Sequence, residues 1–208
     1  MAQPKHQPLT FDTFEDFLVW EKRQETKHEL VDGEPVAMAG ASEGHNIIQG
    51  NIFASALGKL RGGPCRPFPS DMAMKTGSSK GRYPDVMIDC GPRNPANQSA
   101  PNPTVAFEVL SPETQQVDRT IKLAEYNAIP TIAHYVLVEQ SEPVVHIYSR
   151  AATGEFMITP REIRGLDATF ELPAVGISMT MAEVYEGLNF EIERTADSPP
   201  PTRSPWQR

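Results

Sequence analysis

The sequence predicts an α/β (α+β) fold with a mixed, largely antiparallel central sheet flanked by helices. Two observations predict it: short apolar runs typical of strands are interspersed with segments of helical periodicity, and turn signals separate them. With 208 residues, 39% of them hydrophobic, the chain is long enough for one domain with a buried core. The ends at 1–10 and 191–208 are rich in proline and polar residues and are expected to be disordered, which leaves 11–190 as a single domain.

Local signals predict the first elements. Thr13, with an acid three residues on, resembles a capping box and predicts a short amphipathic helix after it. Asp-Gly at 32–33 lies between two apolar runs and predicts a hairpin over 29–38. Ser42 is placed to cap a second helix, which is expected to end at about Leu60, before a Gly-Gly-Pro stop.

The following segments combine strands with a third helix. Strands are predicted near 71–75, 85–90, 104–110, 134–139, 144–150, 155–158 and, bounded by proline, 169–172, and a short helix over 181–186. The third helix is expected from about Glu113 to Ala128. Its buried stripe is predicted to be Val117, Ile121, Ala124 and Ala128, with Asp118, Lys122 and Tyr126 in a row beside that stripe.

Composition limits the classes of protein and the compartment. No apolar run approaches the roughly 20 residues that span a bilayer, and the first residues lack the apolar stretch of a secretion signal. We therefore expect a cytoplasmic protein with no membrane partner. Cys65 and Cys90 are too few for a disulfide framework and lack the paired spacing of a zinc or redox motif, so both are predicted to be free thiols.

Charge is unevenly distributed. The formal net charge of −8 argues against indiscriminate binding to a polyanion. From residue 59 to 82, however, six Lys and Arg residues face a single acid, a local net charge of +5. This strip is either a solvated loop or a surface for nucleic acid, and its candidates for contact with nucleic acid are Lys75, Lys80 and Arg82.

Two acidic residues, Asp85 and Glu108, lie within apolar segments that are predicted to be strands. Residues 91–102 read as a surface loop, so the flanking strands can be antiparallel neighbours. If Cys90 lies opposite Pro103, Asp85 lies opposite Glu108, because antiparallel partners keep a constant sum of residue numbers. Two buried carboxylates that close repel unless a cation joins them, and oxygen ligands favour Mg²⁺, with Mn²⁺ as a substitute.

An ordered set of motifs resembles a known family. The set is Tyr83-Pro84-Asp85, the run Phe107-Glu108-Val109-Leu110-Ser111-Pro112, and Asp118 with Lys122 and Tyr126. It resembles the Uma-type putative restriction endonuclease family, a bacterial branch of the PD-(D/E)XK nuclease superfamily. The likeness includes Glu29-Leu30-Val31-Asp32-Gly33 and His45, and it spans about residues 10 to 185.

The resemblance implies a restriction-endonuclease-like fold and a Mg²⁺-dependent endonuclease that hydrolyses phosphodiester bonds of DNA. Asp85 and Glu108 would be catalytic metal ligands, the carbonyl of Val109 a further ligand, and Lys122 the group that positions or deprotonates the attacking water. The usual superfamily lysine two residues after the glutamate is absent, because Leu110 occupies that position. Lys75 is then the reserve candidate.

Five further residues have a site role and a structural alternative. Each is either an additional member of the site or a side chain with a local role, such as a surface ion pair, a turn cap or a packed ring: Glu29, His45, Asp71, Asp118 and Tyr126.

The sequence leaves two other classes open. One is a nuclease-fold module without turnover that binds nucleic acid or a protein partner, and the other has Asp85 and Glu108 as a hydrogen-bonded internal pair that shares a proton. For an active enzyme, a two-fold homodimer would present one site to each strand of a duplex.

Overall fold

A computed structural model describes residues 9–190 of the chain. The predicted disordered ends, 1–10 and 191–208, lie outside the described residues except for residues 9 and 10. Among the described residues, no helix has both the length and the apolar character needed to cross a membrane.

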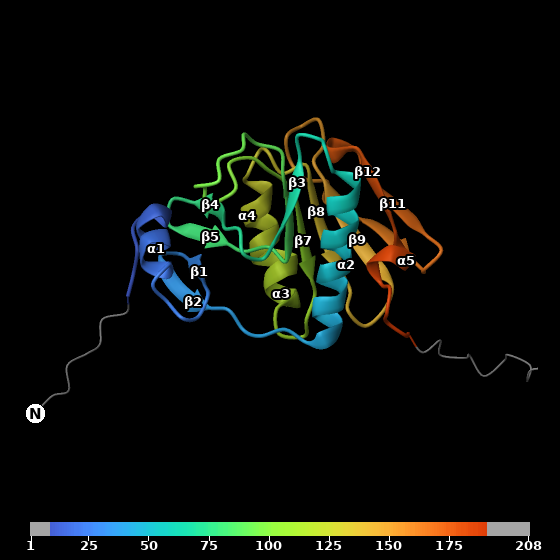
Figure 1. Ribbon diagram of the computed structural model, residues 1–208, viewed down its shortest axis with the longest axis horizontal. Coiled ribbons are helices and arrows are strands. Elements are labelled where there is room, and N and C mark those ends of the chain that lie inside the picture. Colours follow the sequence, from blue (N-terminus) through green and yellow to red (C-terminus); the bar gives the residue numbers. More distant parts are fainter. Residues whose placement is uncertain (1–8, 191–208) are drawn as a thin grey trace, which may run out of the picture.

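A six-stranded mixed sheet forms the centre of the molecule, with strand order β10-β9-β8-β7-β6-β3. Its strands are β3 (Arg66–Pro69), β6 (Val86–Asp89), β7 (Pro103–Val109), β8 (His134–Val138), β9 (Val144–Ser149) and β10 (Arg161–Arg164). Only β7 and β8 pair in parallel; the other neighbours are antiparallel. The predicted fold class, a mixed and largely antiparallel sheet with helices beside it, is confirmed (Figure 1).

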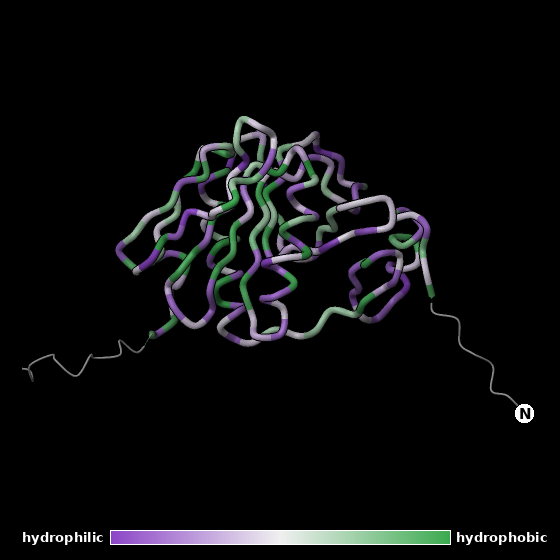
Figure 2. The backbone as a smooth tube through the Cα atoms, turned by 180° about the vertical axis from the view of Figure 1, so that it is seen from behind, coloured by the Kyte–Doolittle hydropathy of each residue, from purple (hydrophilic) through white to green (hydrophobic). Residues whose placement is uncertain are grey.

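The central sheet is covered on both faces (Figures 1 and 2). Apolar side chains of α2 (Glu43–Lys59), of the small sheet β11 (Thr169–Leu172) with β12 (Ile177–Thr180), and of α5 (Met181–Val184) pack on one face. A short 3₁₀ turn, η2 (Pro173–Val175), joins β11 to β12. The other face packs against Tyr126 and Leu123 of the third helical segment. Figure 2 shows the central strands as largely hydrophobic, which agrees with burial on both faces.

A second, four-stranded sheet lies beside the first, with order β2-β1-β5-β4. It contains β1 (His28–Val31), β2 (Glu34–Ala37), β4 (Met74–Gly77) and β5 (Lys80–Arg82), and α1 (Phe14–Glu21) packs on it. The predicted hairpin is confirmed: Asp32 (φ 48°) and Gly33 (φ 87°) both have the left-handed backbone that a two-residue turn of type I′ requires.

Two helix starts follow the capping rules that predicted them. Thr13 Oγ1 accepts a hydrogen bond from the amide of Asp16, and Ser42 Oγ accepts one from the amide of His45. A glycine fixes how α1 sits on the small sheet, because a Cβ on Gly81 would lie 2.1 Å from the Phe14 ring. The strand that carries Arg82 can therefore approach α1 closely.

The third helix differs from the prediction in its winding and in its buried face. It consists of α3 (Gln115–Val117), the π-helical turn η1 (Asp118–Lys122) and α4 (Leu123–Asn127). The predicted apolar stripe was wrong, because Ile121 is 48% exposed and Ala124 and Ala128 are exposed too. The polar row is buried instead: Asp118, Lys122 and Tyr126. A π turn is wider than an α turn, so a helical wheel with 3.6 residues per turn misplaces the residues around it.

Several strand predictions also need correction. The strand expected at 71–75 begins at Met74, and 155–158 is no strand, although Phe156 forms an isolated bridge with Arg150. Four further strands, β3, β5, β10 and β12, were not predicted from the sequence. Each of them has only three or four residues, too few for a period-two pattern to stand out.

The predicted register between the two acid-bearing strands is confirmed over most of its length. Val86, Met87 and Ile88 pair with Phe107, Ala106 and Val105, which keeps the predicted sum of residue numbers. A bulge after Ile88 then places Asp89, and not Cys90, opposite Pro103. The bulge lies at the end of β6 away from Asp85, so the register at the acids is preserved.

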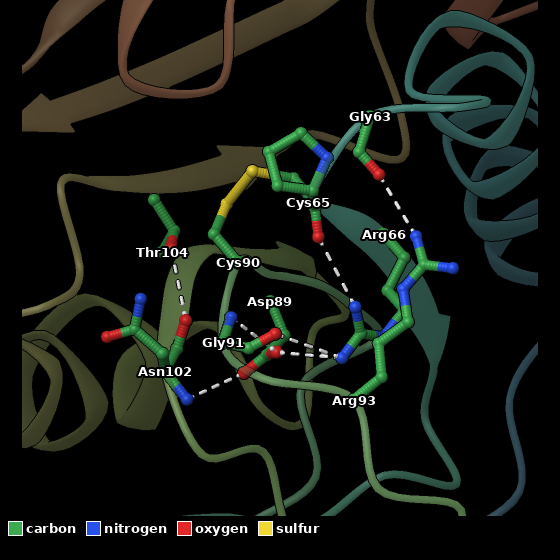
Figure 3. Close-up of a disulfide and its surroundings, with 10 residues drawn as sticks. Gly63, Cys65, Arg66, Asp89, Cys90, Gly91, Arg93, Asn102 and Thr104 are labelled. Atoms are coloured by element: carbon green, nitrogen blue, oxygen red, sulfur yellow. Dashed lines mark hydrogen bonds and ion pairs between the residues drawn. A yellow bond between two sulfur atoms is a disulfide. The ribbon is translucent and has the colours of Figure 1, made fainter.

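The prediction of free thiols was wrong, because Cys65 and Cys90 form a disulfide (Figure 3). Arg66 of β3 pairs with Asp89 of β6 in antiparallel orientation. Cys65, which precedes Arg66, therefore lies beside Cys90, which follows Asp89, although the two cysteines are 25 positions apart in sequence. Asp89 is buried beside the bridge and accepts hydrogen bonds from the amides of Gly91 and Asn102. Disulfides are rare in a reducing cytoplasm, so this bond gives no support to the expected cytoplasmic location.

Reduction of this bridge is expected to lower the free energy of unfolding by about 2–4 kcal/mol, because the reduced unfolded chain gains the freedom of a 25-residue loop. Urea unfolding of the protein with and without reductant measures the difference. A Cys65→Ser, Cys90→Ser double variant is the control, and its midpoint should not respond to reductant. Equal midpoints for the oxidised and reduced wild type would contradict this expectation.

Candidate active site

A cavity of about 540 Å³ opens where β6 begins and β7 ends. Because the two strands are antiparallel, the start of one and the end of the other lie at the same edge of the sheet. The cavity is lined by six of the residues predicted for the site: Glu29, His45, Asp85, Glu108, Val109 and Lys122.

Asp85 directly precedes β6 and is held by two contacts. Its Oδ2 accepts a hydrogen bond of 2.8 Å from the amide of Val109 and lies 3.1 Å from His45 Nε2. The amide contact ties Asp85 to the neighbouring strand, and His45 reaches it from the first turn of α2. His45 Nδ1 is buried without a hydrogen-bond partner among the described residues.

Glu108 lies on the face of β7 that the third helix covers, because Ala106 two residues earlier packs in the same cluster as Tyr126. Glu108 Oε1 accepts a hydrogen bond of 2.7 Å from the Tyr126 hydroxyl and lies 3.0 Å from Lys122 Nζ. The side chain is almost fully buried. Tyr126 therefore fixes the position of Glu108 from the core side.

Lys122 is surrounded by acids in the interior. Its Nζ lies 3.0 Å from Asp118 Oδ1, 3.0 Å from Glu108 Oε1 and 3.9 Å from Glu29 Oε1. Asp118 and Lys122 are therefore not the surface ion pair that their spacing allowed, since both are buried. Three carboxylates thus surround this ammonium group, and one of them, Glu29, also pairs with the buried guanidinium of Arg82.

The electrostatics of Glu108 and Lys122 follow from this crowding. Burial raises the pKa of Glu108 well above its ordinary value, the carboxylates of Asp85 and Asp118 add to the rise, and the ammonium of Lys122 opposes it. Burial alone would lower the pKa of Lys122, but three surrounding carboxylates outweigh burial and raise that pKa. Lys122 therefore keeps its proton at neutral pH.

The carboxylate oxygens of Asp85 and Glu108 determine whether these two residues can hold a divalent ion. Among the described residues, Asp85 Oδ1 and Glu108 Oε2 make no hydrogen bond to the protein, and none joins Asp85 to Glu108 directly. No group of three or more His, Cys, Asp or Glu side chains within 9–190 is arranged to hold a metal. Two carboxylates suit Mg²⁺, which keeps several waters, better than they suit an ion that needs a full set of protein ligands. The residues thus fit a partly hydrated Mg²⁺.

Three other predicted residues lie away from the cavity. Asp71 is in a turn with an exposed side chain that pairs with Lys27. Lys75 Nζ lies 2.6 Å from Glu15, and Lys80 Nζ lies 2.7 Å from Asp32. Asp71 thus lies in a turn, where its carboxylate pairs with Lys27, and Lys75 does not reach Glu108 as the reserve lysine would have to.

Arg82 is buried, which corrects the expectation that it contacts nucleic acid. Its guanidinium donates two hydrogen bonds to Glu125, of 2.8 and 2.9 Å, and one of 2.8 Å to Glu29. A guanidinium enclosed in this way presents no free edge to a phosphate. Burial alone would lower the pKa of Arg82, but the bonds to Glu125 and then to Glu29 raise it.

Sequence reasoning missed the role of Glu125 and of this ion-pair network. Arg82 joins Glu29, which lines the cavity, to Glu125 on the third helix, and Thr76 Oγ1 donates a further hydrogen bond of 3.1 Å to Glu125. A buried Arg needs acidic partners, but the sequence positions 29, 82 and 125 show no spacing that marks these three residues as neighbours. The pairing of β1 with β5 brings Glu29 to Arg82, and Glu125 reaches Arg82 from α4.

Comparisons with known proteins identify a family, two relatives in a cyanobacterium and a solved structure of similar fold. The family model described as "Uma2: Putative restriction endonuclease" matches residues 14–182. The chain is 32% identical over 178 residues to the uncharacterized protein slr1290 of Synechocystis sp.. The aligned region covers 85% of this chain and 92% of that protein. It is 29% identical over 163 residues to the uncharacterized protein sll1609 of the same organism, with 76% and 91% covered.

The crystal structure of a putative nuclease belonging to DUF820 from Anabaena variabilis has a similar fold. The TM-score is 0.64 at 18% sequence identity, and the match covers 83% of this chain and 97% of that chain. At this level of identity the likeness concerns the fold.

Proposed function

The chain belongs to the Uma2 family of putative restriction endonucleases, and from that premise and the geometry of the acidic cavity we propose that it is a Mg²⁺-dependent endonuclease that hydrolyses phosphodiester bonds of DNA. Asp85 and Glu108 hold the metal ion, the Val109 carbonyl is available as a further ligand, and Lys122 is the catalytic cation. DNA is the substrate that the family description suggests.

One observation carries the proposal: Asp85, Glu108 and Lys122 meet in a single cavity that has an excess of buried negative charge. Buried carboxylates are costly unless a cation or a hydrogen-bond donor compensates them. Lys122 pairs with Glu108 and Asp118, and Arg82 pairs with Glu29. Asp85 is left without a Lys or Arg partner among the described residues, since it contacts His45 and the Val109 amide. A divalent ion held by Asp85 and Glu108 would supply the missing positive charge.

When bound, Mg²⁺ supplies Lewis-acid chemistry, which offsets phosphate charge and makes a water acidic enough to attack in line. The protein groups do the rest. Lys122 stays protonated, so its ammonium suits holding a phosphate oxygen and stabilising negative charge in the transition state better than it suits removing a proton. His45 and the Val109 amide hold Asp85, and Tyr126 holds Glu108.

The decisive experiment joins metal binding to cleavage. Calorimetric titration with Mg²⁺ and Mn²⁺ should show binding to the wild type that Asp85→Asn removes. DNA supplied both as a plasmid and as a single-stranded circle should be cut, in at least one of these forms, by the wild type with Mg²⁺ but not with a chelator. Asp167→Asn is the matched control, because Asp167 is exposed and outside the cavity. Metal binding and cleavage that persist in Asp85→Asn would refute the proposed site.

A module without turnover is the second candidate, and two observations favour it. Leu110 occupies the position of the usual superfamily lysine, and the described residues contain no three-ligand metal group. This candidate predicts binding of nucleic acid or of a protein partner without metal uptake. The same titration separates the two, because only the enzyme should bind Mg²⁺.

Lys122→Met is expected to lower kcat by about 10²-fold or more while KM changes much less, because the ammonium acts on charge that develops in the transition state. Steady-state cleavage of a labelled oligonucleotide gives both constants. Lys59→Met serves as the control, since Lys59 pairs with Glu183 at the surface and does not line the cavity. A loss in KM as large as the loss in kcat would make Lys122 a phosphate anchor only.

A further inference from the structure

We propose that the strand reaching this site is unpaired, so that one nucleotide enters the cavity with its base against the apolar wall formed by residues 36–41 and its phosphate toward Lys122. This inference rests on the proposed nuclease function and specifies its substrate as an unpaired nucleic acid strand. Three features of the cavity carry it: its depth, its apolar wall and its shortage of cations.

The reacting groups lie deep in the cavity and not on an open surface. The side chains of Asp85, Glu108 and Lys122 are only 17%, 4% and 10% exposed. A volume of about 540 Å³ is in the range of pockets that enclose small ligands, roughly 300–1,000 Å³. A nucleotide must therefore leave the base stack to bring its phosphate to these groups, which an unpaired strand does at least cost.

One wall of the cavity is apolar and uncharged. Val36 and Ala37 of the edge strand β2, followed by Met38, Ala39, Gly40 and Ala41, line it without a single charged side chain. Val36 is 47% exposed on this wall. Such a surface offers nothing to a sugar-phosphate backbone, but the flat face of a base can be buried against it.

The cavity has too few cations for a duplex. Among the described residues that line the cavity, Lys122 is the only Lys or Arg, whereas four are acids: Glu29, Asp85, Glu108 and Glu113. Duplex binding depends on neutralising several phosphates on both strands. Lys75 and Lys80 of the basic strip are engaged with acids away from the cavity. The charge of Lys122 together with that of a bound metal ion is therefore enough to neutralise one phosphate group in the cavity.

A second cavity of about 220 Å³ continues from the first and shares Ser111, Pro112 and Gln140 with it. Among the described residues, Gln115 adds an uncharged amide to this second cavity and Glu139 adds one carboxylate, and neither Lys nor Arg lines it. Amide groups can hydrogen-bond to the edges of an unpaired base. The second cavity therefore has room and donors for part of the neighbouring nucleotide.

Fluorescence anisotropy with labelled oligonucleotides tests the inference. A single strand of about 20 nucleotides, longer than the roughly 4–16 that single-strand sites cover, is compared with its blunt duplex in Ca²⁺, a hard cation with the same oxygen ligands. The single strand should bind at least about tenfold more tightly than the duplex. A matched RNA strand decides whether DNA or RNA is the preferred source of the unpaired nucleotide.

Val36→Asp should lower the affinity for the single strand about tenfold, since it places a charge where the base packs. Val19→Asp is its control: Val19 is similarly exposed but lies on α1, outside the cavity. Equal or tighter binding of the duplex, or equal losses in both variants, would overturn the inference.

The inference and the proposed function fail in different ways. Duplex preference together with cleavage that needs Asp85 would overturn the inference and leave the nuclease standing. Preference for the single strand without metal-dependent cleavage would support the inference and refute the nuclease. Absence of binding to every oligonucleotide would overturn both.

Discussion

Glu108→Gln is expected to reduce metal-dependent cleavage of DNA by about 10³-fold or more, whichever of the single-stranded and duplex forms the wild type cuts faster. Gln has nearly the same shape and can still accept the hydrogen bond from Tyr126, but it removes the negative charge that a divalent ion requires. Cleavage rates at saturating Mg²⁺ measure the effect. Glu113→Gln is a demanding control, because Glu113 lines the same cavity on its exposed rim. Residual cleavage above about one tenth of the wild-type rate would contradict the assigned role of Glu108.

The same variant gives a second readout through pH. The folded-state pKa of Glu108 is raised by burial, so its contribution to stability is fully present below the ordinary glutamate pKa and is lost as pH rises through the raised value. Without metal, the wild type should therefore lose stability relative to Glu108→Gln as pH increases over that window. Urea unfolding at several pH values, with and without Mg²⁺, tests this. A stability difference that does not change with pH would contradict the burial argument.

Arg82→Met is expected to lower the free energy of unfolding by about 3–5 kcal/mol, because it leaves Glu125 and Glu29 without their buried counter-charge. Arg82→Lys should restore little of this loss, since an ammonium cannot make both bonds to Glu125 in the same plane. Urea unfolding measures the losses of both variants.

An exposed arginine provides the control for this stability prediction. Arg164 also pairs with two acids, Glu142 and Glu162, but on the surface. Arg164→Met should therefore cost less than about 1 kcal/mol. Similar losses for Arg82→Met and Arg164→Met would show that burial of the network contributes little.

Local signals predicted those parts of the fold in which neighbours in sequence decide the structure. The Asp32-Gly33 turn needs left-handed backbone at two positions, and the caps at Thr13 and Ser42 satisfy amides within three residues. The register that places Asp85 opposite Glu108 followed from the loop over 91–102 and from the alternation of side chains along the two strands that this loop joins. Each of these inferences used interactions that short sequence windows contain.

The failures come from interactions between distant residues. Nothing near Cys65 shows that Cys90 lies beside it until β3 pairs with β6. Likewise, the periodicity of the third helix placed Ile121 inside, whereas the buried charges of Asp118 and Lys122 occupy the interior and a π turn accommodates them. The family resemblance identified the candidate site residues. The acids that surround Lys122 could be identified only from the folded structure.

The segment from Gly91 to Asn102 joins β6 to β7 at the end of the strands farthest from Asp85 and Glu108. The two acids are thus positioned by strand pairing, independently of the length of that connection. A break in the backbone within that segment should therefore leave the geometry of the cavity unchanged. The anchoring of Cys90 to Cys65 would keep one of the cut ends attached to the rest of the sheet.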